Sequence, residues 1–186
     1  ASAVGVVRAE SSVDFSPFAV SGSTIKSTDT GGVGLSDALQ FMTSVSDSPI
    51  AVSDTLLKAS FVGLHTEVGP MHRSPIILTR VTSTAGLYGG SFKGLEDSPV
   101  TITGSTIFGT KLAMELTSFL RSAFSASTSV LTSDSTTARA ALEVNGLVDT
   151  SPFSFTDTAV ASSLTSGTTP ALQFKLAVSG SLLTVS

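Results

Sequence analysis

The 186-residue sequence predicts a mainly β fold in which antiparallel sheets are accompanied by two or three short helices. Short runs of β-branched and aromatic residues recur along the chain, separated by Ser, Pro and Gly. Two longer extended runs flank a turn at Gly69-Pro70. Near the end of the sequence, from Leu172 to Val178, apolar and polar residues alternate as in a half-buried strand.

The first strands are expected at residues 3–8 and 12–20, where Val and Phe are frequent. The longest extended runs cover residues 55–68 and 75–84, and the short segment "GPMHR" joins them. Two extended runs around a Gly-Pro turn are typical of a β-hairpin. We therefore expect an antiparallel hairpin in the middle of the chain.

Helix signals are fewer than strand signals. Ser36 is a good N-cap for a short helix through "DALQFMTSV". Ser133 or Asp134 can begin a second helix, "STTARAALEVN", and Gly146 stands where such a helix would end. These signals predict two short helices against a background of strands.

Other segments are less distinctive. Residues 110–125 fit both a helical stripe and strand alternation, and we favour a strand to about residue 118, followed by a turn or a helix start. Residues 85–99 and 160–169 are expected to be loops. No tandem period is evident, and we interpret the two copies of Val-Asp-x-Ser-Pro-Phe, at 13–18 and 148–153, as a chance match.

The composition indicates self-association. Charged residues make up 13% of the chain, against about 25% in an average soluble domain. Close to a third of the residues are Ser or Thr, and the mean hydropathy is +0.39. No apolar run approaches the roughly 20 residues that a membrane-spanning helix needs. A surface with so little charge is best tolerated when other copies cover it, so we expect a large homo-oligomer and no membrane partner.

Charge and cysteine content exclude several further classes. The net charge of −4 argues against a strongly basic nucleic-acid binder. The absence of cysteine excludes a disulfide framework and thiolate metal sites. At this length we expect one domain spanning residues 1–186.

A resemblance to a phosphate-binding loop occurs near the middle of the chain. Gly104 and Gly109 follow a β-branched run and precede a lysine, as in a P-loop. However, Lys111 stands one residue late, and Leu112 occupies the position of the Ser or Thr that would hold magnesium. We therefore interpret the glycines as turn residues and expect no nucleotide.

The two histidines do not complete a catalytic or metal site. His65 and His72 flank the Gly-Pro turn with Glu67 between them, so a hairpin could bring both rings to one metal. No third strong ligand is evident. The sequence also lacks the Gly-x-Ser-x-Gly pattern of a nucleophile elbow. We therefore expect a protein that is not an enzyme and that has no cofactor.

Basic residues are densest in the expected hairpin. Lys58, Arg73 and Arg80 lie there together with the two histidines, and the only acidic residue among them is Glu67. These three cations are the predicted contacts to nucleic-acid phosphates. A solvated strand edge is the alternative, because lysine often protects such edges.

The layout resembles two families of viral coat protein. The segment "TLLKASFVGLHTEVGPMHRSPIILTRVTST" is similar to the central hairpin in coat proteins of single-stranded RNA bacteriophages. "KLAMELTSF" is similar to the last strand of those proteins, and "SDSTTARAALEVNGLV" to the helix that follows it. This resemblance implies an α+β subunit. It departs from the family at the end, where residues 171–185 read as a strand.

Jelly-roll capsid subunits of small plant and picorna-like viruses are the second family. They have about this length, and their last strand is similar to "ALQFKLAVSGSLLTV", although this chain has no basic N-terminal arm. Either resemblance implies a structural protein of the virion that self-assembles into a capsid around a nucleic-acid genome, with RNA favoured. The alternative function is another homopolymeric subunit, such as a pilin or a phage tail-tube or fibre module.

Overall fold

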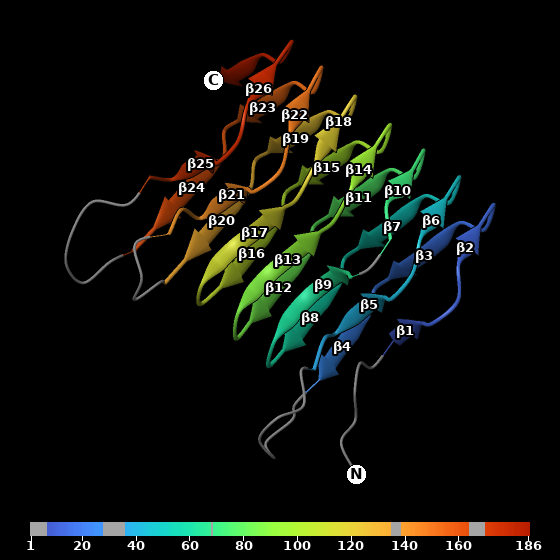
Figure 1. Cartoon of the computed structure of the whole chain (residues 1–186). Coiled ribbons are helices and arrows are strands. Elements are labelled where there is room, and N and C mark those ends of the chain that lie inside the picture. Colours follow the sequence, from blue (N-terminus) through green and yellow to red (C-terminus); the bar gives the residue numbers. More distant parts are fainter. Residues whose placement is uncertain (1–6, 28–35, 68, 135–138, 164–169) are drawn as a thin grey trace.

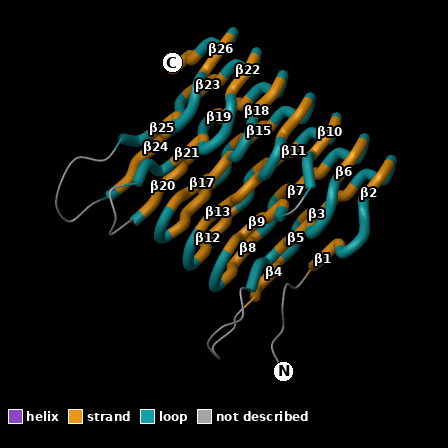
Figure 2. The backbone as a smooth tube through the Cα atoms, viewed as in Figure 1, coloured by secondary structure: helices purple, strands orange, loops and turns teal. Residues whose placement is uncertain are grey.

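Four parallel β-sheets form the whole of the structure, a computed structural model that describes residues 7–27, 36–67, 69–134, 139–163 and 170–186 (Figure 1). No helix occurs within these ranges. The chain visits the four sheets in a fixed order and then returns to the first, so that each circuit forms one coil stacked on the previous coil. This arrangement is a parallel β-solenoid (Figure 2).

Sheets A, B and C each receive one strand from every described coil, and sheet D receives one from every coil but the last. Sheet A contains β1 (Val7–Ala9), β5 (Leu39–Phe41), β9 (Val62–Thr66), β13 (Tyr88–Phe92), β17 (Leu112–Leu116), β21 (Leu142–Val144) and β25 (Leu172–Phe174). Sheet B contains β2 (Val13–Asp14), β6 (Val45–Ser46), β10 (Met71–His72), β14 (Leu95–Glu96), β18 (Phe119–Leu120), β22 (Val148–Asp149) and β26 (Val178–Ser179). Sheet C contains β3 (Phe18–Ser21), β7 (Ile50–Ser53), β11 (Ile76–Thr79), β15 (Val100–Thr103), β19 (Phe124–Ser127), β23 (Phe153–Thr156) and β27 (Leu183–Val185). Sheet D contains β4 (Thr24–Ser27), β8 (Leu56–Ala59), β12 (Thr82–Ala85), β16 (Thr106–Gly109), β20 (Val130–Ser133) and β24 (Ala159–Ser162).

The core lies inside the coils and consists of columns of similar side chains. In sheet C, Ile50, Ile76 and Val100 are successive register partners, and all three are buried. Toward the last coils the columns become aromatic, and Phe124 stacks on Phe153 with ring centroids 5.6 Å apart. Because every strand is short and parallel, the stacking of like residues between coils does most of the core packing.

The corner between sheets B and C has the same construction in every coil. One residue has a positive φ, and the next is a serine. In every described coil but the first, the Oγ of that serine bonds the preceding coil. The positive-φ residues are Phe15, Asp47, Arg73, Asp97, Arg121, Thr150 and Gly180. The serines that follow are Ser16, Ser48, Ser74, Ser98, Ser122, Ser151 and Ser181. Proline follows most of these serines, and its fixed φ suits the entry into the next strand.

A continuous line of hydrogen bonds runs through this serine column. The backbone N–H of Ser74 donates to the Oγ of Ser98 at 2.9 Å, and the N–H of Ser98 donates to the Oγ of Ser122 at 2.9 Å. Each pair is 24 residues apart. The same Oγ donates to a carbonyl two residues earlier, as Ser98 does to Glu96 at 2.9 Å. The column therefore satisfies buried backbone groups that the corner removes from the strand ladders.

The expected antiparallel sheets with helices, in either the RNA-phage-coat-like α+β form or the jelly-roll form, are wrong. All pairings in the described part of the chain are parallel. The hairpin expected over 55–84 is wrong as well, because this segment contains β8 to β12 and passes through all four sheets. A Gly-Pro turn between two extended runs does not distinguish a chain reversal from a corner that leads into another sheet.

The helices expected near Ser36 and Ser133 are also wrong where the structure describes them. The first segment contains β5 and β6, and the second contains β21, while residues 135–138 lie outside the described part. The loop expected at 85–99 contains β13 and β14. The single strand expected around Leu172 to Val178 divides into β25 and β26, which belong to different sheets.

Several smaller expectations also changed. Residues 12–20 contain two strands, β2 and β3, and 110–125 contains β17, β18 and the start of β19. The predicted loop at 160–169 includes the end of β24, and residues 164–169 lie outside the described part. The two copies of Val-Asp-x-Ser-Pro-Phe both form the corner between sheets B and C, so the chain does have a tandem repeat.

Candidate ligand-binding face

The outward side of sheet A carries a column of polar side chains, one from each coil. Leu39 and Phe41 point into the core, and Gln40 between them points out. In register with Gln40 lie Arg8 on one side and His65 on the other. The column continues through four further register partners, Ser91, Glu115, Glu143 and Gln173. We call this column, together with the adjoining Asp37, Glu67 and Asn145, the polar face of sheet A.

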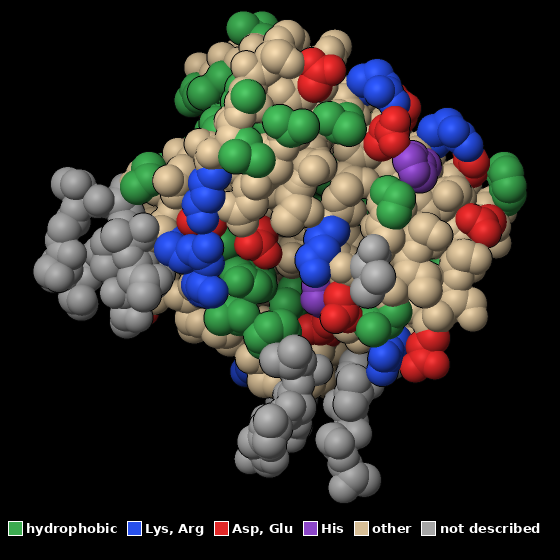
Figure 3. All heavy atoms as spheres, viewed as in Figure 1, with side chains coloured by type: hydrophobic (Ala, Val, Ile, Leu, Met, Phe, Trp, Pro, Cys, Tyr) green, Lys and Arg blue, Asp and Glu red, His purple; other side chains and the backbone are tan. Residues whose placement is uncertain are grey.

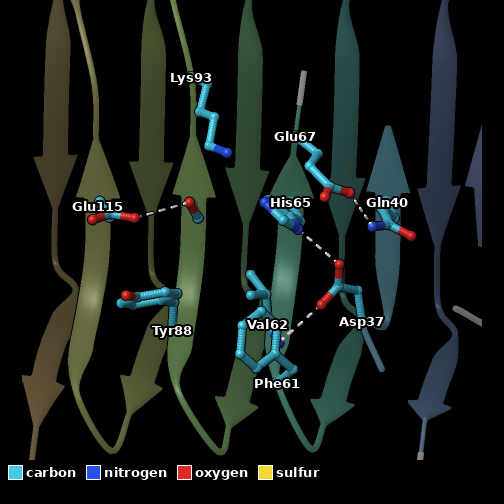
Figure 4. Close-up of a pocket in the computed structure, with 10 residues that line it drawn as sticks. Asp37, Gln40, Phe61, Val62, His65, Glu67, Tyr88, Lys93 and Glu115 are labelled. Atoms are coloured by element: carbon cyan, nitrogen blue, oxygen red, sulfur yellow. Dashed lines mark hydrogen bonds and ion pairs between the residues drawn. The ribbon is translucent and has the colours of Figure 1, made fainter. Parts of the chain in front are cut away.

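A groove of about 290 Å³ lies on this face. Its lining residues are Asp37, Gln40, Phe61, Val62, His65, Glu67, Tyr88, Ser91, Lys93 and Glu115 (Figure 4). They come from three neighbouring coils and the start of a fourth, so the groove runs across the strands. Tyr88 and Phe61 lie at one side of it, and Glu67 and Lys93 at the other (Figure 4). The groove therefore has an aromatic side and a charged side.

A buried pair of polar residues holds the centre of the groove. The Nδ1 of His65 lies 2.7 Å from the Oδ2 of Asp37, and the backbone N–H of Val62 donates to the Oδ1 of Asp37 at 3.1 Å. Asp37 is 1% exposed and His65 is 8% exposed. Because Asp37 fixes the Nδ1 side of the ring, the Nε2 of His65 is the atom left to meet a ligand.

Further hydrogen bonds order the remaining side chains. The Nε2 of Gln40 donates to Glu67 at 2.8 Å, and the Oγ of Ser91 donates to Glu115 at 3.4 Å. On the aromatic side, the Nζ of Lys111 donates to the hydroxyl of Tyr88 at 3.2 Å and lies 5.4 Å from the centre of its ring. These bonds tie residues of adjacent coils to one another, which makes the face rigid.

Three buried acceptors on this face lack a hydrogen-bond partner within the described part of the chain. They are the Oε1 of Gln40, the Oε1 of Glu143 and the Oδ1 of Asn145. The other carboxylate oxygen of Glu143 accepts from Lys175 at 2.8 Å and lies 3.2 Å from Arg139. Leaving a buried acceptor without a donor costs about 1–3 kcal/mol. Ordered water is the usual partner of such buried acceptors.

The predicted phosphate contacts lie away from this face. Lys58 lies in β8 of sheet D, Arg73 at the corner between sheets B and C, and Arg80 at the corner between sheets C and D. Arg73 makes two hydrogen bonds to Asp47, both 2.6 Å long, and Arg80 makes two to Asp54. The structure therefore gives two of the three cations carboxylate partners from the preceding coil.

The pair of Arg73 and Asp47 belongs to a column of alternating charge. Asp47, Arg73, Asp97 and Arg121 occupy the same corner in four successive coils. Hydrogen bonds from Arg73 hold the pKa of Asp47 below its ordinary value of 3.8, and those from Arg121 do the same for Asp97. Figure 3 shows such acidic and basic groups next to each other, among wide areas of other polar side chains and backbone. The charges on this surface therefore largely compensate one another.

The two histidines are in different sheets. His65 is in β9 of sheet A, and His72 is in β10 of sheet B with its Nδ1 3.0 Å from Glu96. Across the ranges that the structure describes, no group of three His, Asp or Glu side chains is placed to hold a metal ion. No helix in those ranges is long and apolar enough to cross a membrane.

The two glycines of the P-loop-like segment lie at the two ends of a strand. Gly104 has a φ of 57° at the corner between sheets C and D, which confirms its interpretation as a turn residue. Gly109 is the last residue of β16, so its interpretation as a turn residue is wrong. The segment between them is largely extended.

Comparison with known proteins gave no relative: no known family, no curated protein and no solved structure matches this chain. The fold places the chain in the class of parallel β-solenoids.

The polar face was missed because no sequence motif marks it. Its members become visible only when the coils are aligned on the corner serines. Gln40 then stands eight residues before Ser48, and Glu115 stands seven residues before Ser122.

Proposed function

We propose that this chain is a structural module that joins copies of itself end to end, coil on coil. The observation that carries the proposal is the match between the apolar cross-sections of the first and the last described coils. Val178, Leu183 and Val185 belong to core columns, yet they are 46%, 50% and 73% exposed. Apolar side chains in such a position favour association with a surface of the same cross-section.

The first coil has that cross-section. The column of Leu183 begins with Phe18, and the column of Val185 begins with Val20. Both Phe18 and Val20 are partly buried against the core. A second copy stacked in register would therefore place apolar side chains of one copy against apolar side chains of the other in both columns. Sheets A, B and C would continue from one copy into the next.

Polar groups match at the same junction. The serine column ends at Ser181, whose Oγ accepts from the N–H of Ser151 at 2.9 Å. A stacked copy would offer the Oγ of its own Ser16 to the N–H of Ser181. Lys175 would then lie beside Glu10 of the second copy, because both stand two residues beyond the polar column of sheet A. Apolar, hydrogen-bonding and charged groups all support the same register.

Such a contact is heterologous, so it propagates into an open filament unless the rotation between copies closes a ring. This geometry favours the homopolymeric fibre among the functions that the sequence suggests. Enclosure of a genome in a virion stays a prediction, and it rests on the composition and the coat-protein resemblance.

Light scattering tests the proposal. We expect particles far larger than the 18.8 kDa chain at neutral pH, with little dissociation in high salt because the junction is mostly apolar. The double variant Leu183→Asp, Val185→Asp should give monomers. Ile77→Asp is the matched control, because Ile77 points outward from the middle of sheet C and is 40% exposed. A stable wild-type monomer, or a double variant that still assembles, contradicts the proposal.

A further inference from the structure

We infer that the groove on the polar face of sheet A binds a neutral, hydroxyl-rich saccharide. The inference does not depend on end-to-end assembly, since the groove residues come from the interior coils of one chain. It rests on the polar side chains that line the groove, the aromatic side of the groove, and the balance of charge along it.

The polar side chains that line the groove favour a ligand rich in hydroxyl groups. The lining includes the amide of Gln40, the Nε2 of His65, the hydroxyl of Ser91 and the carboxylates of Glu67 and Glu115. Sugar hydroxyls supply donors in number, and each hydroxyl can also accept from a neighbouring side chain.

The aromatic side of the groove suits the apolar face of a sugar ring. Tyr88 and Phe61 are half-buried, with ring centroids 6.3 Å apart and an interplanar angle of 70°. Figure 4 shows the ring of Tyr88 edge-on, below Glu115, so one ring face is turned toward the groove. The bond from Lys111 to the Tyr88 hydroxyl holds the ring in this position. Aromatic rings with a polar handle are effective at such half-wet sites.

The charge along the groove argues against an anionic ligand. The groove is lined by three carboxylates, those of Asp37, Glu67 and Glu115, and by Lys93 and the ring of His65. Carboxylates are therefore at least as numerous as cations. A phosphate or a uronic acid would have to approach these carboxylates. A neutral saccharide has no such penalty and can donate to them.

The length of the polar face suits an oligomer. Successive members of its column are separated by the strand spacing of about 4.8 Å. That spacing is comparable to the length of one pyranose unit in an extended chain. Gln40, His65, Ser91 and Glu115 are consecutive in the column. An extended oligosaccharide lying across the strands can therefore meet one polar side chain per sugar.

Calorimetry with cellohexaose, and with hexagalacturonate as the anionic counterpart, tests the inference. We expect saturable binding of cellohexaose and at least tenfold weaker binding of the anionic chain. Tyr88→Ala should weaken cellohexaose binding about tenfold. Phe108→Ala is the matched control, because Phe108 lies half-buried on the outward side of sheet D, and it should leave the affinity unchanged.

A second variant separates ligand binding from folding. Gln40→Met removes the amide of a groove residue and keeps the length of the side chain. We expect about tenfold weaker binding, with a thermal midpoint within a few degrees of wild type. No binding of cellohexaose, preferential binding of hexagalacturonate, or full affinity in both Tyr88→Ala and Gln40→Met would overturn the inference. Light scattering of the same samples reports on assembly separately.

Discussion

The backbone N–H of Ser74 donates to the Oγ of Ser98, 24 residues later, at a distance of 2.9 Å. The single proton of this hydroxyl is shared between the carbonyl oxygens of Met71 and Glu96, each 2.9 Å from the Oγ. Both serines are fully buried. One hydroxyl therefore satisfies groups of two coils at a corner where strand pairing stops. The abundance of serine in this chain has a structural use that composition alone does not reveal.

Replacing Ser98 by Ala should destabilise the fold by about 1–3 kcal/mol, because the buried N–H of Ser74 loses its acceptor. Urea denaturation followed by circular dichroism measures the change. Ser125→Ala is the control, since its Oγ lies 3.4 Å from Thr101 on the outward side of sheet C. We expect the control to stay within about 0.5 kcal/mol of wild type. Equal effects of the two substitutions would show that the serine column does not stabilise the corner.

Thr128→Gly should stabilise the protein. Thr128 has a φ of 49° and an exposed side chain at the corner between sheets C and D. The left-handed conformation costs a non-glycine residue about 1–2 kcal/mol, which exceeds the roughly 0.5–1 kcal/mol entropic cost of glycine. A higher thermal midpoint is the expected result. A lower midpoint would show that the Thr128 side chain contributes more than the strain it carries.

The carboxylate of Asp47 should titrate below its ordinary pKa of 3.8 because Arg73 donates two hydrogen bonds to it. In Arg73→Gln this pKa should rise toward 3.8, as measured by NMR of the side-chain carboxyl carbon. Since the folded pKa is the lower one, the stability that the pair contributes is present above pH 3.8 and is lost as the pH falls through the folded pKa.

Arg121→Gln provides the control for this titration, because Arg121 hydrogen-bonds Asp97 and not Asp47. It should raise the pKa of Asp97 and leave that of Asp47 almost unchanged. An Asp47 pKa that does not respond to Arg73→Gln would contradict the pairing. The pairs are exposed, so the effect on global stability should be small.

Binding of single-stranded RNA through Lys58, Arg73 and Arg80 stays a prediction. Each arginine would have to exchange its aspartate for a phosphate. If all three contact phosphates, their replacement by Ala should flatten the logarithmic salt dependence of binding by about two units. Fluorescence anisotropy with a labelled oligonucleotide at several salt concentrations gives this slope. An unchanged slope would remove the three residues from any RNA-binding surface.

The β content was predictable from the sequence, because β-branched and aromatic residues recur in every coil. The parallel arrangement was not, because each strand is only two to five residues long and alternation restarts at every corner. The segment from Val13 to Phe18 contains parts of two strands in two sheets, yet it reads as one extended run. Its near-identical copy at 148–153 was the strongest available sign of a repeat.

The polar face could not be predicted for a related reason. Asp37 and His65 are 28 residues apart, and only the coil brings them within 2.7 Å. Asp37 was expected in the first turn of a helix, where a carboxylate has a different use. Because the number of residues per coil varies, a fixed repeat length does not align the members of such a column. Aligning the coils on their corner serines does.

Negative-stain electron microscopy of the purified chain at neutral pH tests the central claim of end-to-end stacking most directly. We expect unbranched filaments one solenoid wide, which are lost in the Leu183→Asp, Val185→Asp variant and kept in Ile77→Asp. Closed shells, or single particles the size of one chain at every concentration, would contradict it.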